Sequence, residues 1–60
     1  MLTKEMVADY FGTQFNCFTI LGSFSEINSD GKKELFWNVS YLDDIYVFDN
    51  YGCCIYKVEN

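Results

Sequence analysis

The hydrophobic repeat of this chain changes once, and that change divides it into two kinds of secondary structure. Before Gly12 the apolar residues recur every three or four positions, the spacing of one helix face. After Gly12 apolar and polar residues mostly alternate, the repeat of a half-buried strand. A chain of 60 residues is long enough for one domain only, so we expect residues 1–60 to form a single α+β unit.

The first segment, Thr3 to Phe11, has the signals of a short helix. Thr3 is a good N-cap, Glu5 places negative charge in the first turn, and Gly12 favours termination. A helix of this length is marginal alone. It is therefore expected to pack on the rest of the chain through its apolar positions, which are Leu2, Met6, Val7, Tyr10 and Phe11.

The remaining residues predict an antiparallel meander of three or four strands. Short turns rich in Asn, Asp and Gly separate the apolar runs, and strands joined in this way pair as hairpins. Gly22 interrupts the first run and predicts a bulge or a bend. With the helix on one face of the sheet, the result is a two-layer α+β fold. The expected strands are residues Phe15–Ile27, Glu34–Leu42, Ile45–Phe48 and Cys53–Val58.

The composition predicts a protein without catalytic activity. There is no histidine, so a Ser-His or Cys-His nucleophile pair is absent. Asp43 and Asp44 are the only adjacent carboxylates, and neighbours in an extended chain point to opposite faces. A solvated turn explains them better than acid–base chemistry. A chain this short also has little room for a ligand pocket of roughly 300–1,000 Å³.

The three cysteines, Cys17, Cys53 and Cys54, do not predict a metal site. Structural zinc takes four Cys or His ligands, usually in spaced pairs. We therefore expect no metal and no other cofactor. The favoured interpretation of the adjacent pair is that one thiol packs as a small apolar group while the other faces away. The alternatives are a disulfide from one of them to Cys17 and an intermolecular disulfide.

Nine acidic residues against four lysines give a net charge of −5. With no arginine and only one lysine pair, direct binding of nucleic acid is not expected. A protein partner with a basic surface is the natural counterpart, although the charge also serves solubility. The chain shows neither a signal peptide nor an apolar run that could span a membrane. We expect a cytoplasmic protein, in the host cytoplasm if its source is viral.

The surplus of aromatic residues, which make up 20% of the chain, is its most informative feature. The runs Glu34–Leu42 and Ile45–Phe48 are apolar on both faces, and a single helix covers only one face of a sheet. If it covers the face of Leu35 and Trp37, an uncovered face remains for a partner. The alternative is a sheet curled like a small barrel, which buries these residues. The aromatic residues predicted for the uncovered face are Phe36, Tyr46, Phe48 and Tyr56.

These features predict a small, acidic, non-catalytic protein-binding module that acts as an inhibitor or adaptor. By analogy of size and charge, small acidic proteins of phages and mobile elements block basic, nucleic-acid-binding host proteins. The alternative is a structural homo-oligomer, such as a homodimer, that self-associates through its aromatic sheet face. The residues predicted to contact the partner are Phe36, Tyr46, Phe48, Asp43, Asp44 and Asp49.

Overall fold

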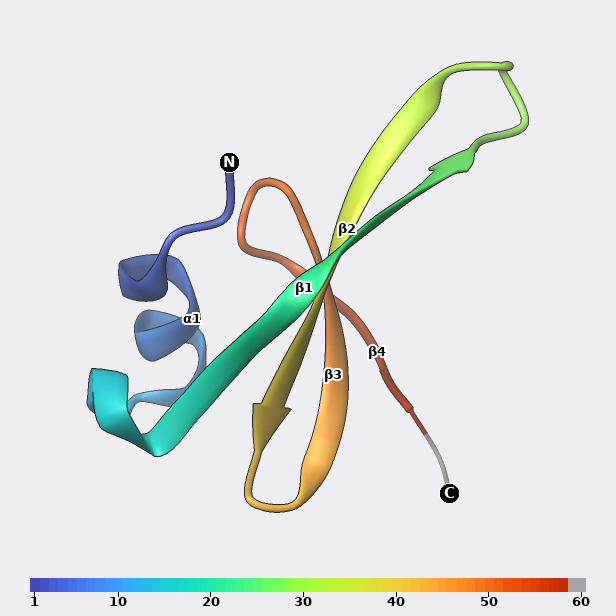
Figure 1. Cartoon of the computed structure of the whole chain (residues 1–60). Helices are drawn as coiled ribbons and strands as arrows, with labels where there is room; N and C mark the ends of the chain where they lie inside the picture. The colour runs from blue at the N-terminus through green and yellow to red at the C-terminus, as the bar shows by residue number, and fades with distance from the viewer. Residues whose placement is uncertain (59–60) are drawn as a thin grey trace.

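The computed structural model describes residues 1–58 as one short N-terminal helix, one 3₁₀ turn and an open four-stranded antiparallel sheet (Figure 1). The strands follow the chain order β1-β2-β3-β4, so β1 and β4 are the sheet edges and the barrel-like alternative does not occur. The predicted α+β meander is confirmed. The elements are α1 (Lys4–Phe11), η1 (Phe15–Cys17), β1 (Phe18–Ile27), β2 (Lys33–Tyr41), β3 (Asp44–Asp49) and β4 (Cys54–Val58).

Helix α1 is capped as its sequence predicts. The Met6 amide donates to the Thr3 hydroxyl oxygen at 3.3 Å. At the other end Gly12 adopts the left-handed conformation, with φ of 65°, and its amide donates to the Ala8 carbonyl. Because Thr3 is the extended N-cap, the helix proper begins one residue later than the predicted segment.

A two-residue turn joins β2 to β3 and sets the register between these two strands. Leu42 and Asp43 both have positive φ, 50° and 66°, and Tyr41 lies opposite Asp44. Two consecutive positive φ values are typical of the type I′ hairpin turn, whose twist matches that of the strands. A loop of two residues places odd-numbered residues of β2 opposite even-numbered residues of β3, such as Trp37 opposite Phe48.

This register corrects the predicted assignment of side chains to faces. Residues directly opposite each other in a ladder share a face. Tyr46 and Phe48 therefore lie on the same face as Val39 and Trp37, beneath the helix, and not beside Phe36. Phe48 is fully buried, with its ring 5.2 Å from that of Tyr10, and the Tyr46 ring lies 5.0 Å from that of Phe11. Their predicted place on the uncovered face is wrong.

The hydrophobic core lies between α1 and this face. It gathers apolar side chains from the helix, the chain before it and the first three strands. The rings of Phe11 and Tyr41 stack at 4.0 Å on its border, and the Trp37 indole donates to the Asn50 side-chain oxygen at 3.2 Å. The buried members of the core are Leu2, Val7, Ala8, Phe18, Val39 and Phe48.

Two bulges change which residues face the helix. In β1 the register shifts between Ile20 and Gly22, which confirms the predicted irregularity at this glycine. Phe18 and Ile20 join the helix side, but after the extra residue Phe24 points to the opposite face, across from Phe36. A second bulge lies between β3 and β4.

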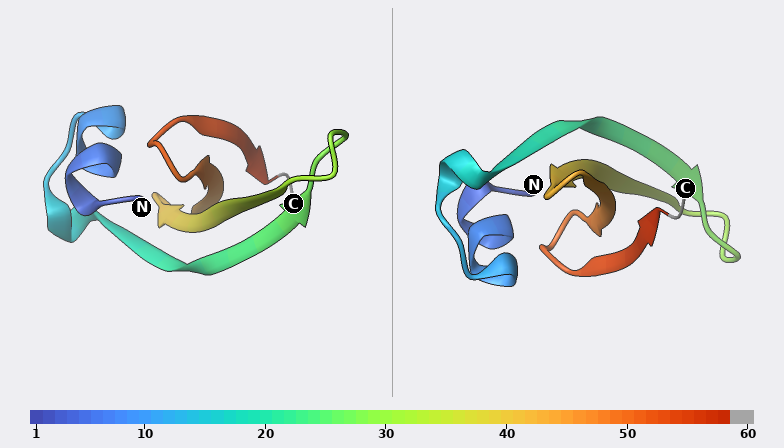
Figure 2. Two further views of the ribbon diagram at one scale, coloured as in Figure 1. Left: turned by 90° about the horizontal axis from the view of Figure 1, so that it is seen from above. Right: turned by 90° about the horizontal axis from the view of Figure 1, so that it is seen from below.

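The β1–β2 hairpin extends beyond the rest of the sheet as an arm (Figures 1 and 2). Residues 33–35 of β2 pair with β1, whereas pairing with β3 begins only at Phe36. The tip of the arm is stabilised by Asn28, whose side-chain oxygen accepts from the amides of Asp30 and Lys32, both at 3.0 Å. Helix α1 lies at the opposite end of β1, so it does not cover the arm.

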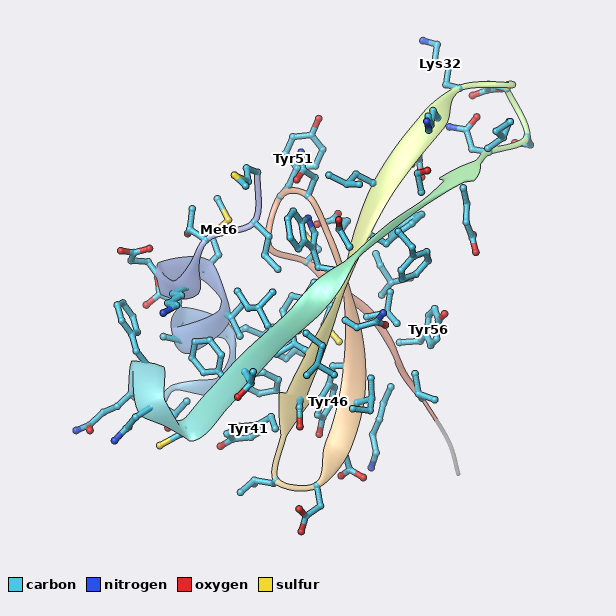
Figure 3. All side chains as sticks on the ribbon, viewed as in Figure 1. Met6, Lys32, Tyr41, Tyr46, Tyr51 and Tyr56 are labelled. Atoms are coloured by element: carbon cyan, nitrogen blue, oxygen red, sulfur yellow. The ribbon has the colours of Figure 1, made fainter. Side chains whose placement is uncertain are left out.

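The β3–β4 turn packs on the helix through a glycine. Gly52 has φ of +92°, and a Cβ built there would lie 3.0 Å from the Met6 Cβ. In Figure 3 Met6 lies close to the turn that holds Tyr51. This position therefore requires glycine for two reasons, its backbone conformation and the approach of the helix.

We expect Gly52→Ala to lower the free energy of unfolding by about 2 kcal/mol, through left-handed strain plus crowding against Met6. Gly31→Ala is the matched control, because Gly31 has φ of +77° but nothing within 4 Å of its added Cβ. Its expected loss is about 1 kcal/mol, from strain alone. Urea denaturation measures both, and equal losses would contradict the packing of the turn on α1.

Candidate functional site

The face of the sheet opposite the helix holds an apolar hollow of about 100 Å³. Val47 at its base is only 2% exposed although no helix lies on this side, because side chains of the neighbouring strands surround it. The rings of Phe24 and Phe36 lie 5.6 Å apart in a tilted arrangement. The residues of this apolar hollow are Phe24, Glu26, Phe36, Val47, Ile55 and Tyr56.

The rim of the apolar hollow is open to solvent. Ile55 and Tyr56 are about half exposed, at 50% and 53%. In Figure 3 Tyr56 lies on the far side of the sheet from α1, whereas Tyr41 and Tyr46 lie on the strands at the helix end. Tyr56 and Phe36 therefore lie on the face that the helix leaves uncovered, as predicted.

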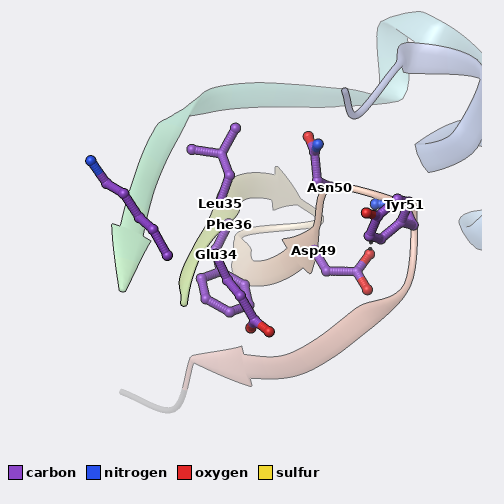
Figure 4. A pocket seen from close by; sticks show the side chains of 7 residues that line it. Glu34, Leu35, Phe36, Asp49, Asn50 and Tyr51 are labelled. Atoms are coloured by element: carbon purple, nitrogen blue, oxygen red, sulfur yellow. Dashed lines mark hydrogen bonds between the residues drawn. The ribbon is translucent and has the colours of Figure 1, made fainter. Parts of the chain in front are cut away.

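A second concavity, the edge cleft, opens beside the apolar hollow and shares Phe36 with it (Figure 4). Its volume of about 310 Å³ is at the lower limit of ligand pockets, larger than expected for this chain. One wall is the start of β2 and the other is the β3–β4 turn. The edge cleft is lined by Lys33, Glu34, Leu35, Phe36, Asp49, Asn50 and Tyr51.

Asp49 shapes the turn that forms one wall of the edge cleft. Its side-chain oxygen accepts from the amides of Tyr51 and Cys53, both at 2.9 Å, and Figure 4 shows the first of these bonds. An aspartate that caps two amides of its own turn has a structural role. Tyr51 at the turn is 82% exposed, so its ring projects into solvent beside the cleft.

Two carboxylates lie directly opposite each other on the arm. Glu26 pairs with Glu34 in the β1–β2 ladder, on the same face as Phe24 and Phe36. Like charges in this position destabilise a sheet. One Glu34 oxygen accepts from the Asn28 side-chain amide at 2.9 Å, but no described lysine forms an ion pair with either glutamate. The acid pair therefore concentrates negative charge beside both concavities.

The three predicted aspartates do not form one cluster. Asp43 is at the tip of the β2–β3 turn, and Asp44 beside it forms an ion pair with Lys57 at 3.4 Å. Asp49 is at the opposite end of β3. Of the three, Asp49 lines the edge cleft and the other two line neither this cleft nor the apolar hollow; the Asp49 side chain also caps the turn. The acid that lines the apolar hollow is instead Glu26, which lies opposite Glu34.

Phe24, Glu26, Val47 and Ile55 belong to the apolar hollow but are not among the residues predicted for it from the sequence. The bulge at Gly22 is the signal that could have placed Phe24 and Glu26, because one extra residue moves every later side chain to the other face. Leu42 is a further exposed apolar residue that was not predicted from the sequence. It is 73% exposed in a conformation that bulky residues rarely adopt, so it presents an apolar side chain at the tip of the turn.

All three thiols are free. Cys54 packs at the border of the core while Cys53 is exposed, as the favoured interpretation of the pair holds. The pKa of Tyr10 is raised above its usual 10.0 by its neighbour Cys54. The larger cause is a hydrogen bond between the two side chains, and the smaller one is the charge of Cys54. Cys54 thus belongs to the contact between α1 and the sheet.

Within residues 1–58 no three Cys, Asp or Glu side chains are grouped as metal ligands would be. No helix in the same residues has the length and apolar character needed to cross a membrane. Comparison of the chain with protein-family models, with curated proteins and with solved structures finds no match.

We expect Glu26→Gln to raise the free energy of unfolding by about 0.2–1 kcal/mol, because it removes repulsion across the ladder. Asp30→Asn is the matched control, since it removes one charge from the exposed tip of the same arm without an opposing carboxylate. Its effect should stay within about 0.5 kcal/mol. Urea denaturation at low salt compares them. A stabilisation that is equal in both variants would assign the effect to net charge instead of the pair.

Proposed function

We propose that this protein is a non-catalytic protein-binding module that receives its partner on the apolar hollow and the adjoining edge cleft. The observation that carries the proposal is the composition of the face opposite the helix. Phe24, Phe36 and Tyr56 gather there with exposed aliphatic surface, and nothing in the described chain covers them. Aromatic clusters of this kind, rimmed by charge, are typical of interface hot spots.

The charge of the site favours a basic partner. The chain carries −5 overall, and Glu26 and Glu34 add a repulsive pair at the rim of the hollow. A lysine or arginine of the partner placed beside them would replace repulsion by attraction. The same field would accelerate encounter with a basic surface. An inhibitor or adaptor that covers the basic, nucleic-acid-binding surface of a host protein fits these properties.

A homo-oligomer is the second candidate, and the outer edge of β1 favours it. β1 is an edge strand of ten residues, and Phe18 to Ser25 carry no charge. Exposed edges that lack lysine and proline tend to pair with another strand. Leu21 and Ile27 on this strand are 56% and 74% exposed.

The leading function predicts that Tyr56→Ala weakens partner capture by about tenfold or more, the effect of losing one aromatic hot spot. Phe15→Ala is the control, because Phe15 is exposed to a similar degree, 49% against 53%, but lies beside α1. The tagged proteins are used to capture partners from cells that naturally contain the chain, with quantitative mass spectrometry. A partner that is retained by Tyr56→Ala and lost with Phe15→Ala would contradict the proposed site.

Sedimentation equilibrium separates the two candidates. The leading function predicts a monomer at low micromolar concentration. Self-association through β1 predicts a dimer that Ser25→Lys abolishes, because a charge on the edge opposes strand pairing. A dimer that persists in this variant and dissociates in Tyr56→Ala would instead make the apolar hollow a subunit interface.

A further inference from the structure

The β2 segment that lines the edge cleft has main-chain groups without a strand partner. Residues 33–35 pair with β1 on one side, and β3 ends at Asp49, opposite Phe36. Along an antiparallel strand, successive residues direct their N–H and C=O groups to alternate sides. Some of these groups must therefore point toward the cleft.

The hydrogen bonds at the two turns show which main-chain groups of residues 33–35 point toward the cleft. The Asn28 amide donates to the Lys32 carbonyl at 2.8 Å, so the main chain of Lys32 points toward β1. By alternation the main-chain N–H and C=O groups of Glu34 also point toward β1, whereas those of Lys33 and Leu35 point away from it. At the other turn the Asp49 amide donates to the Cys53 carbonyl at 2.9 Å, which turns Asp49 toward β4. Phe48 therefore points toward Trp37, in agreement with the same alternation.

We propose that the edge cleft receives an extended segment of the protein partner as an added strand beside residues 33–35, with a lysine or arginine opposite Glu34. This inference rests on the proposed protein-binding function and specifies how the partner is held. Strand addition supplies main-chain hydrogen bonds for affinity, and the alternate side chains supply specificity. The segment would run antiparallel to β2, along the line that β3 leaves at Asp49.

The neighbouring side chains define the sequence that fits. A residue opposite Glu34 shares the face of Glu26 and Glu34, so a cation there would complete a row with two carboxylates. The preceding residue of the segment lies opposite Leu35, which is 38% exposed and favours an apolar neighbour. The following residue lies opposite Lys33, which favours a polar one. The exposed ring of Tyr51 forms the other wall.

The test is a titration of the full ¹⁵N-labelled chain with the peptide acetyl-Val-Lys-Thr-Thr-amide into the low millimolar range. We expect amide shift changes centred on Lys33 and Leu35. We also expect that hydrogen exchange of these two amides slows, while Glu34 and Phe36, already bonded to β1, exchange slowly throughout. A peptide with Glu in place of Lys should bind at least about tenfold more weakly, a difference of about 1.4 kcal/mol.

Two methylated peptides test the main-chain geometry. The Val amide of the bound segment donates to Leu35, so N-methylation of Val should abolish binding. The Lys amide points away from β2, so N-methylation of Lys should leave binding within about threefold of the parent peptide, the variation ordinary for one exposed group. In the protein, Glu34→Gln should weaken the Lys peptide severalfold, whereas Asp30→Asn should not.

The outcomes separate this inference from the function on which it rests. Equal effects of the two methylations, or no binding of any peptide, would overturn strand addition. Shift changes confined to Phe24, Phe36 and Tyr56 would also overturn it and would leave the hollow as the binding site. The loss of a captured partner in Tyr56→Ala tests the binding function independently, because Tyr56 does not line the edge cleft.

Discussion

The pairing of β2 with β3 across a two-residue turn is the constraint on which the rest of this small fold depends. Because the turn holds only Leu42 and Asp43, Trp37 and Val39 share a face with Phe48 and Tyr46. That face becomes the core under α1. A turn one residue longer would exchange the faces of β3, since side chains alternate along a strand. The positive φ values at the turn are therefore linked to the burial of Phe48.

The other face follows from the same register and from the bulge in β1. Val47 and Phe36 are directed away from the helix, and the extra residue before Gly22 brings Phe24 beside Phe36. Helix α1 packs on only one face of the sheet. The chain thus leaves the apolar hollow exposed next to the acid pair of Glu26 and Glu34. Like charges opposite each other in a ladder disfavour the sheet, which fits the proposed binding role of this face.

Much of the fold was predictable from local signals, whereas the site was predictable only in part. The local signals are Thr3, Gly12 and the Asn28 turn, which act through residues close in sequence. The helix, its ends and the meander can therefore be predicted from the sequence. The face of a strand depends on the exact length of a turn and on each bulge. The acidic pair Asp43-Asp44 suggested a turn over both residues, yet the turn is Leu42-Asp43 and Asp44 begins β3. A two-residue turn at either position places even-numbered residues of β3 opposite odd-numbered residues of β2, so Tyr46 and Phe48 face the core. The prediction failed because it carried the odd–even alternation unchanged across the turn, while Phe36 and Tyr56 were placed correctly.

The footprint of a partner on the two faces tests the account most directly. The ¹⁵N- and ring-labelled chain would be mixed with the captured partner, and amide and aromatic signals compared in the free and bound states. We predict that the changes fall on Phe24, Phe36 and Tyr56 and on the amides of residues 33–35. Signals of α1 and Phe15 should stay unchanged. A footprint confined to α1, η1 and the Leu42-Asp43 turn would contradict the proposed binding face.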